Sequence, residues 1–161
     1  MKQLWAPWRM AYIEQARDNN GGCILCDKPG GTRDESSLIL FRGRSNFVIM
    51  NAYPYNSGHL MVAPLAHIAR LSLLDDATRH EHFDLVSRCA DILKEALNPA
   101  GFNIGLNLGR IAGAGVDQHL HTHIVPRWEG DTNFMPVLAD TRVVNQAIAD
   151  TYTRLAPLFK A

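Results

Sequence analysis

The sequence has no excess of charge of either sign: 16 Lys and Arg residues balance 16 Asp and Glu residues. We therefore expect neither a basic surface for duplex nucleic acid nor a polybasic patch for an anionic membrane. The balance still allows a small anionic ligand, because such a ligand needs only a few local positive groups and backbone N–H donors.

Long apolar runs and a cysteine framework are also missing. No stretch approaches the roughly 20 apolar residues of a membrane-spanning helix, and Lys2 is not followed by the apolar segment of a secretory signal. Only three cysteines occur, two of them as the pair Cys23 and Cys26, which is not the pattern of a secreted disulfide scaffold. We expect a cytoplasmic protein that binds no membrane.

Length and patterning predict a single domain over residues 1–161, with no internal repeat. Residues 1–20 are expected to form an aromatic N-terminal arm, and residues 128–161 a C-terminal tail and helix. β-branched and apolar runs predict strands over 38–41, 46–51, 59–64, 102–108 and 119–125. Helices are predicted over 75–97 and from about 140 to 159.

The longer predicted helix carries an apolar stripe with the spacing of one helix face. The histidines near its start, His80 and His82, fall off this stripe, so we expect both to be solvent-exposed. Cys89 lies beside the stripe and is expected to be an unreactive packing residue. The stripe consists of Phe83, Val86, Ala90, Leu93 and Leu97.

Three of the seven histidines, His119, His121 and His123, alternate with other residues within a five-residue segment. On a strand, the rise of about 3.3 Å per residue places neighbouring imidazoles about 6.7 Å apart and the outer pair about 13 Å apart. Because zinc binds imidazole nitrogen at about 2 Å, one ion cannot collect all three unless the strand is badly bent. We therefore predict divided roles, and favour a reacting centre over a polar face of a solvated strand.

Two neighbouring features support chemistry at this row. The pair Cys23 and Cys26 could be a redox pair, half of a zinc site, or simple packing, and we favour zinc because no strand precedes it as a redox motif requires. The glycine-rich loop 107–116 leads directly into the histidines and can bring backbone N–H groups close to phosphate oxygens. A neutral imidazole nucleophile beside such a loop suits nucleotidyl transfer through a histidine–phosphorus intermediate.

The segment 119–125, His-Leu-His-Thr-His-Ile-Val, resembles the motif of the histidine-triad (HIT) family, and the resemblance extends from the cysteine pair through Arg127. Within the family, Pro126 with Arg127 resembles the branch that includes dinucleoside polyphosphate hydrolases rather than the phosphoramidase branch. Residues 5–9 together with residues 130–134 resemble a bacterial subgroup that includes diadenosine tetraphosphate phosphorylases. The resemblance implies an α+β fold, a sheet of about five antiparallel strands with two main helices, and a homodimer formed through the long helix and an adjoining strand.

The resemblance also implies roles at individual positions. His121 matches the nucleophile that attacks the α-phosphorus of a nucleotide, His123 a phosphate contact, and His59 a fourth, supporting histidine. The matching nucleotide-binding positions are Asn51, Asn107, Gly115 and Val116. Those of a structural zinc site, with no open coordination position and no organic cofactor, are Cys23, Cys26, His67 and His119.

Two positions depart from the family pattern. Thr122 stands where an apolar residue is usual, a mild change if its methyl group packs inward. Val116 stands where Ser or Thr often assists the leaving group, so we expect that role to pass to a backbone group, to Asp117 or to Gln118, or to be absent.

The leading hypothesis is an enzyme that transfers a nucleotidyl group from a dinucleoside polyphosphate to phosphate or to water. The alternative is a nucleotide-binding or interaction module with weak phosphoramidase or hydrolase activity. A third hypothesis is a zinc hydrolase that uses the histidine row as an open metal site.

Overall fold

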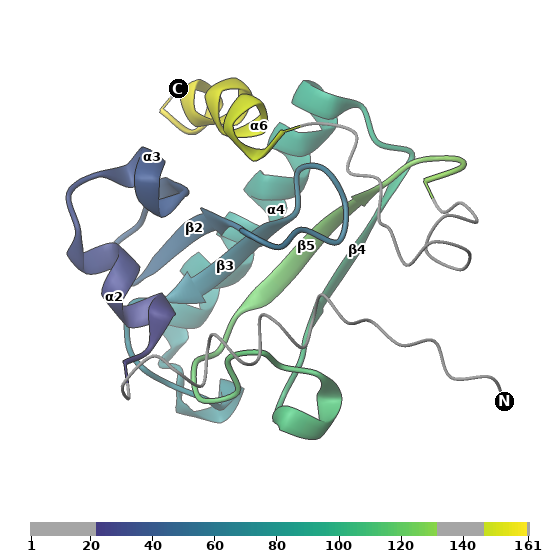
Figure 1. The fold of residues 1–161 in the computed structure, drawn as a ribbon. Coiled ribbons are helices and arrows are strands. Elements are labelled where there is room, and N and C mark those ends of the chain that lie inside the picture. Colours follow the sequence, from purple (N-terminus) through teal and green to yellow (C-terminus); the bar gives the residue numbers. More distant parts are fainter. Residues whose placement is uncertain (1–21, 132–146, 161) are drawn as a thin grey trace, which may run out of the picture.

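A computed structural model of the chain describes residues 22–131 and 147–160. Its strands form one sheet in the order β1-β2-β3-β5-β4, with each neighbouring pair antiparallel (Figure 1). This confirms the predicted α+β fold and its five-stranded antiparallel sheet. The strands are β1 (Ile39–Arg42), β2 (Asn46–Met50), β3 (Leu60–Pro64), β4 (Gly101–Leu106) and β5 (Thr122–Arg127).

Helices lie on opposite faces of this sheet, with the long helix on one face and the first short helix on the other (Figure 1). The long helix α4 (Asp76–Leu97) packs against β2, β3 and β5, and α6 (Ile148–Leu155) packs against α4. The short helices α2 (Ile24–Gly30) and α3 (Asp34–Ser37) lie at the β1 side. Three 3₁₀ turns, Leu71–Leu73, Arg110–Ala112 and Ala156–Phe159, complete the described elements. Within the described residues, no helix has both the length and the apolar character to cross a membrane.

Every residue of β2 is buried because both faces of this strand are covered. Val48 and Met50 join the main core under α4, whereas Phe47 and Ile49 join a second cluster with Leu25 of α2. Successive side chains of a strand point to opposite faces, so each face of the sheet draws on alternate residues of the same strand.

The same alternation divides β5. Ile124 lies in the core under α4, and Thr122, two residues earlier, hydrogen-bonds to His82 of α4. His123 therefore points to the opposite face, where Met61, its partner in β3, packs on the α2 cluster. The chemistry-bearing face of β5 is thus the one turned away from the long helix.

Two predicted boundaries are wrong. Strand β5 begins at Thr122, so His119 and His121 precede the regular strand; there the backbone N–H of Leu120 donates to the carbonyl of Ile68 instead. Helix α6 begins only at Ile148, after the extended residue Ala147. Residues 140–146 of the predicted last helix, and the predicted aromatic arm 1–20, lie outside the described residues.

Helix α4 begins as predicted, because the carboxylate of Asp75 accepts the backbone N–H of Thr78 and caps the first turn. The predicted stripe is rotated, however: Phe83 is 48% exposed, and His82, predicted to be exposed, is fully buried. Burial is tolerated because both ring nitrogens of His82 have hydrogen-bond partners. Cys89 is buried as predicted, and burial raises the pKa of its thiol to about 12.

The turn before β3 depends on Gly58, which has a positive φ of 75°. A Cβ atom at this position would lie 2.6 Å from Cδ1 of Leu97 and 3.1 Å from Cδ2 of Leu93. Both the backbone conformation and the close approach to α4 therefore exclude a side chain.

We expect Gly58→Ala to destabilise the protein by about 2 kcal/mol or more, combining left-handed backbone strain with overpacking. The matched control is Gly101→Ala, because a Cβ atom there meets nothing within 4 Å. Urea unfolding of both variants measures the difference. Equal stability of the two variants would contradict this account of the turn.

Candidate active site and metal centre

The ring of His119 is directed by a backbone carbonyl. Its Nε2–H donates to the carbonyl oxygen of Pro64 at 2.7 Å, which leaves the lone pair on Nδ1. Nδ1 lies 3.3 Å from Sγ of Cys23 and 3.4 Å from Sγ of Cys26. The Nδ1 atom of His67 lies 3.2 Å from the same Cys26 sulfur.

This cluster fits a closed metal site. The ligand atoms of Cys23, Cys26, His67 and His119 all lie within 4.8 Å of one another. Around tetrahedral zinc, a nitrogen and a sulfur ligand are about 3.6 Å apart, close to the separations of 3.2–3.4 Å between these atoms. A carbonyl that orients the ligating imidazole is the usual outer-shell support of such a site. The four predicted ligands are therefore close enough together to bind a metal.

The ring of His121 is oriented by the neighbouring main chain. Its Nδ1–H donates to the carbonyl oxygen of His119 at 2.8 Å, so the lone pair is on Nε2. Burial lowers the pKa of His121, which keeps the ring neutral and this lone pair available at neutral pH. The ring centroids of His121 and His123 are 4.8 Å apart.

The opposite tautomer follows for His123. The backbone N–H of Tyr55 donates to Nδ1 of His59 at 3.1 Å, so His59 carries its hydrogen on Nε2. That Nε2–H donates to Nδ1 of His123 at 2.9 Å, which leaves the hydrogen of His123 on Nε2. A lone pair on His121 thus lies beside an N–H donor on His123, an arrangement suited to attack on phosphorus and contact with its oxygen.

A pocket that is partly open to solvent adjoins His121. The predicted residues Asn51 and Val116 also line it, and Oδ1 of Asn51 is fixed by the backbone N–H of Tyr53 at 2.9 Å. Asn107 and Gly115, predicted to bind nucleotide, are not among the lining residues. The remaining lining residues are Ile24, Leu25, Lys28, Ile49, Met50, Ala52, Tyr53 and Met61.

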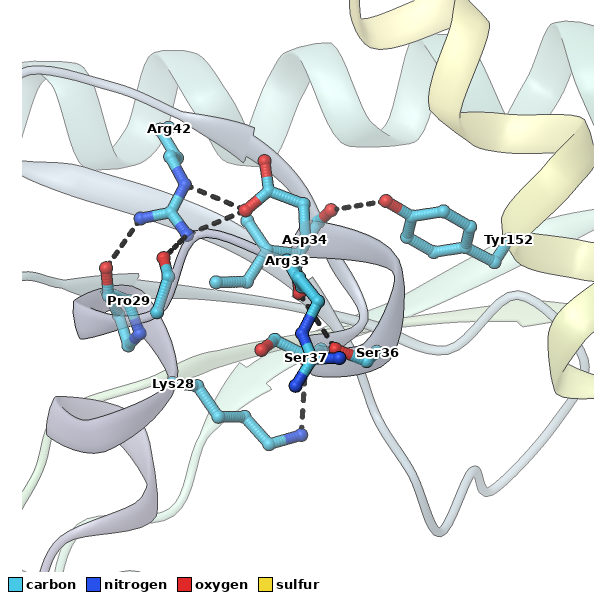
Figure 2. A network of polar contacts seen from close by, with 10 residues as sticks. Lys28, Pro29, Arg33, Asp34, Ser36, Ser37, Arg42 and Tyr152 are labelled. Atoms are coloured by element: carbon cyan, nitrogen blue, oxygen red, sulfur yellow. Dashed lines mark hydrogen bonds and ion pairs between the residues drawn. The ribbon is translucent and has the colours of Figure 1, made fainter.

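The wall that α2 contributes is tied to strand β1 (Figure 2). Arg42 donates to the carbonyls of Pro29 and Gly31 at 2.6 and 2.9 Å and to the Asp34 carboxylate at 2.6 Å. Lys28 donates to the carbonyl of Ser37 at 3.2 Å, and burial lowers the pKa of this lysine. These bonds fix the segment that joins α2 to α3, and with it one side of the pocket.

Sequence reasoning missed several residues of the site. Ile24 and Leu25 lie between the two cysteines. Because the cysteines were predicted to share a metal with His119, that prediction could have placed Ile24 and Leu25 near the three histidines. Tyr55 contributes a backbone N–H, and its ring lies 4.7 Å from that of His59. No sequence pattern marks Lys28 as a pocket residue.

Comparisons with known proteins identify the family of this chain. A family model described as the HIT domain matches residues 33–130. The AP-4-A phosphorylase of Mycobacterium tuberculosis is 37% identical over 162 residues, covering 97% of this chain and 83% of that protein. The bis(5'-adenosyl)-triphosphatase of Dictyostelium discoideum is 32% identical over 98 residues, covering 59% of this chain and 63% of that protein. The chain belongs to the HIT family.

Solved structures agree with the fold. A zinc-bound histidine triad family protein from Mycobacterium smegmatis superimposes with a TM-score of 0.67 at 23% identity. The match covers 86% of this chain and 94% of that one. The predicted fold is confirmed by this structure, and the predicted family by the family model and the 37% identical relative.

Proposed function

We propose that this protein transfers a nucleotidyl group from a dinucleoside polyphosphate, by way of a nucleotide bound covalently to His121. The observation that carries the proposal is the pair of opposite tautomers, a lone pair on Nε2 of His121 beside a hydrogen on Nε2 of His123. The 37% identical relative named AP-4-A phosphorylase supports this class of substrate.

In the first step Nε2 of His121 attacks the α-phosphorus. An N–P bond forms, the bridging P–O bond breaks, and the leaving polyphosphate nucleotide takes the electron pair. The ring becomes cationic, and the carbonyl of His119, already bonded to Nδ1–H at 2.8 Å, stabilises that charge. His123 donates a hydrogen bond to the phosphoryl oxygen, with its ring held by His59.

In the second step an oxygen of inorganic phosphate attacks the same phosphorus. The N–P bond breaks, His121 regains its lone pair, and a nucleoside diphosphate leaves. Diadenosine tetraphosphate plus phosphate thus gives ATP plus ADP, whereas attack by water would give ATP plus AMP. The name of the 37% identical relative favours phosphate as the acceptor.

We expect the His121→Asn variant to lose at least about 1,000-fold in turnover, because the nucleophile is removed. Its affinity for the dinucleotide should change little, because Asn still fills the wall of the pocket. Chromatography of the products with and without phosphate measures turnover and identifies the acceptor. His80→Asn, an exposed histidine of α4, is the matched control.

Full turnover by His121→Asn would contradict the covalent intermediate. Products of ATP and AMP in the presence of phosphate would identify a hydrolase. Nucleotide affinity without turnover in the wild-type chain would favour a binding module.

We further propose that Cys23, Cys26, His67 and His119 hold structural zinc. The support is a donor set of two thiols and two imidazoles, with one imidazole oriented by the carbonyl of Pro64. When bound, such an ion supplies folding energy rather than Lewis-acid catalysis, because four protein ligands leave no open position.

Elemental analysis should find zinc in the wild-type chain and in Cys89→Ala, but little in Cys23→Ala. Both substitutions remove one thiol, and only Cys23 lies in the cluster. Chelation should lower the melting temperature and the activity together, because the ion stabilises the fold. Loss of activity at an unchanged melting temperature would instead indicate a catalytic metal.

We also propose a homodimer formed through β4 and α4. β4 is an edge strand of the described sheet, and its Ile104 is 49% exposed. Phe83 of α4 is 48% exposed. An apolar residue on an open strand edge is a surface that a second copy would cover.

Ile104→Lys should therefore yield monomers, because a charge on the strand edge opposes pairing. Light scattering would show the mass fall from twice 17.9 kDa to 17.9 kDa. Ile111→Lys is the matched control, since Ile111 is fully exposed but lies in the 3₁₀ turn Arg110–Ala112. A wild-type monomer would refute the proposed dimer.

A further inference from the structure

A second histidine system lies on the opposite face of the sheet. His82 of α4, Asn46 of β2 and Thr122 of β5 are each at most 1% exposed. Nδ1 of His82 lies 2.9 Å from Oδ1 of Asn46, and Nε2 lies 2.7 Å from Oγ1 of Thr122. These contacts join the long helix to the triad strand through its first residue.

The direction of each bond can be assigned. The Asn46 amide nitrogen donates to the carbonyl of Thr78 at 3.0 Å and to the carboxylate of Glu81 at 2.9 Å. Its oxygen therefore accepts from Nδ1–H of His82, which makes Nε2 of His82 the acceptor of the Thr122 hydroxyl. Burial lowers the pKa of His82 to about 4, so this acceptor persists at neutral pH.

Thr122 occupies a distinctive position. It lies between His121 and His123, and it is the residue at which the regular strand begins. His121 precedes the strand and, in the described sheet, is not paired with a residue of β3 or β4. The Thr122 hydroxyl is bonded on the α4 face, and the two neighbouring side chains are thereby turned toward the other face.

We propose that His82 is a positioning residue for the triad: by accepting the Thr122 hydroxyl, it fixes the rotation of the backbone between His121 and His123. The inference rests on the proposed function of those two rings. It also gives a role to the hydroxyl of Thr122, which donates a hydrogen bond to His82 of α4.

A purely structural role makes a different prediction. A buried hydrogen bond contributes little net stability, and the main cost of breaking it comes from the partner left unsatisfied. If the network only stabilises the fold, a variant that breaks it should behave like any core variant of equal stability. If it positions the triad, turnover should fall even where the protein is fully folded.

The test compares Thr122→Val with Thr122→Ser and with Val86→Ala. Valine keeps the shape of the side chain but removes the hydroxyl, whereas serine retains it. Val86→Ala truncates a buried residue of α4 that takes no part in the hydrogen bonds of this network. Assays run well below all melting temperatures, with dinucleoside tetraphosphate and phosphate as substrates.

We expect Thr122→Val to lower kcat by about 10-fold to 100-fold with little change in KM, because a small displacement of a reacting group has a large effect on rate. Thr122→Ser should recover most of this loss, and Val86→Ala should keep the wild-type kcat. His82→Phe should lose as much as Thr122→Val, and the double variant no more, because the two residues act as one unit.

Nitrogen NMR of the imidazole rings supplies a readout that does not need activity. Thr122→Val should change the ring shifts of His121 and His123, and Val86→Ala should not. Equal shifts and equal kcat in Thr122→Val and Val86→Ala would overturn the positioning role. If the wild-type chain lacks turnover, the proposed reaction fails, and the NMR comparison alone decides the positioning role.

Discussion

A neutral imidazole donates through one nitrogen and accepts through the other, and the whole site depends on this constraint. Each buried histidine has one ring nitrogen committed to a partner that fixes the state of the other. The carbonyl of Pro64 accepts the Nε2–H of His119, so the lone pair on Nδ1 of that ring faces the cysteines. The carbonyl of His119 accepts the Nδ1–H of His121, which leaves the lone pair of His121 on Nε2. The backbone N–H of Tyr55 donates to Nδ1 of His59, so His59 carries its hydrogen on Nε2. His59 in turn donates to Nδ1 of His123, which leaves the hydrogen of His123 on Nε2. Main-chain groups thus assign different chemistry to three identical side chains.

His119 therefore contributes to two parts of the site, one through its ring and the other through its carbonyl. Its ring faces Cys23 and Cys26, while its carbonyl accepts a hydrogen bond from the ring of His121. The two cysteines also flank Ile24 and Leu25, which line the pocket beside His121. A shift of the cysteine pair would therefore also move this part of the pocket wall.

Periodicity in the sequence was sufficient to predict that the strands and the long helix exist, because each depends on local geometry. The divided roles of the three histidines stay a prediction. Periodicity failed at His82, since two faces of α4 have acceptable apolar spacing and only the partners Asn46 and Thr122 make the buried choice favourable. It also failed at the start of β5, where the contact between Leu120 and Ile68 replaces ladder pairing. Contacts between residues distant in sequence decided both outcomes, and a single sequence does not contain that information.

The alternation along β5 has a consequence for how this protein can vary. Neighbouring residues of the strand serve opposite sides of one layer, so a single insertion or deletion between positions 122 and 125 would exchange the reacting side with the supporting side. A substitution in this segment changes one side chain, whereas a change of length moves every following side chain of the strand to the opposite face of the sheet. The loop before this segment is not part of this alternation, and its end is held by the bonds from His119 to Pro64 and from Leu120 to Ile68. Evolution can therefore lengthen the approach to the site while the site itself keeps a fixed count of residues.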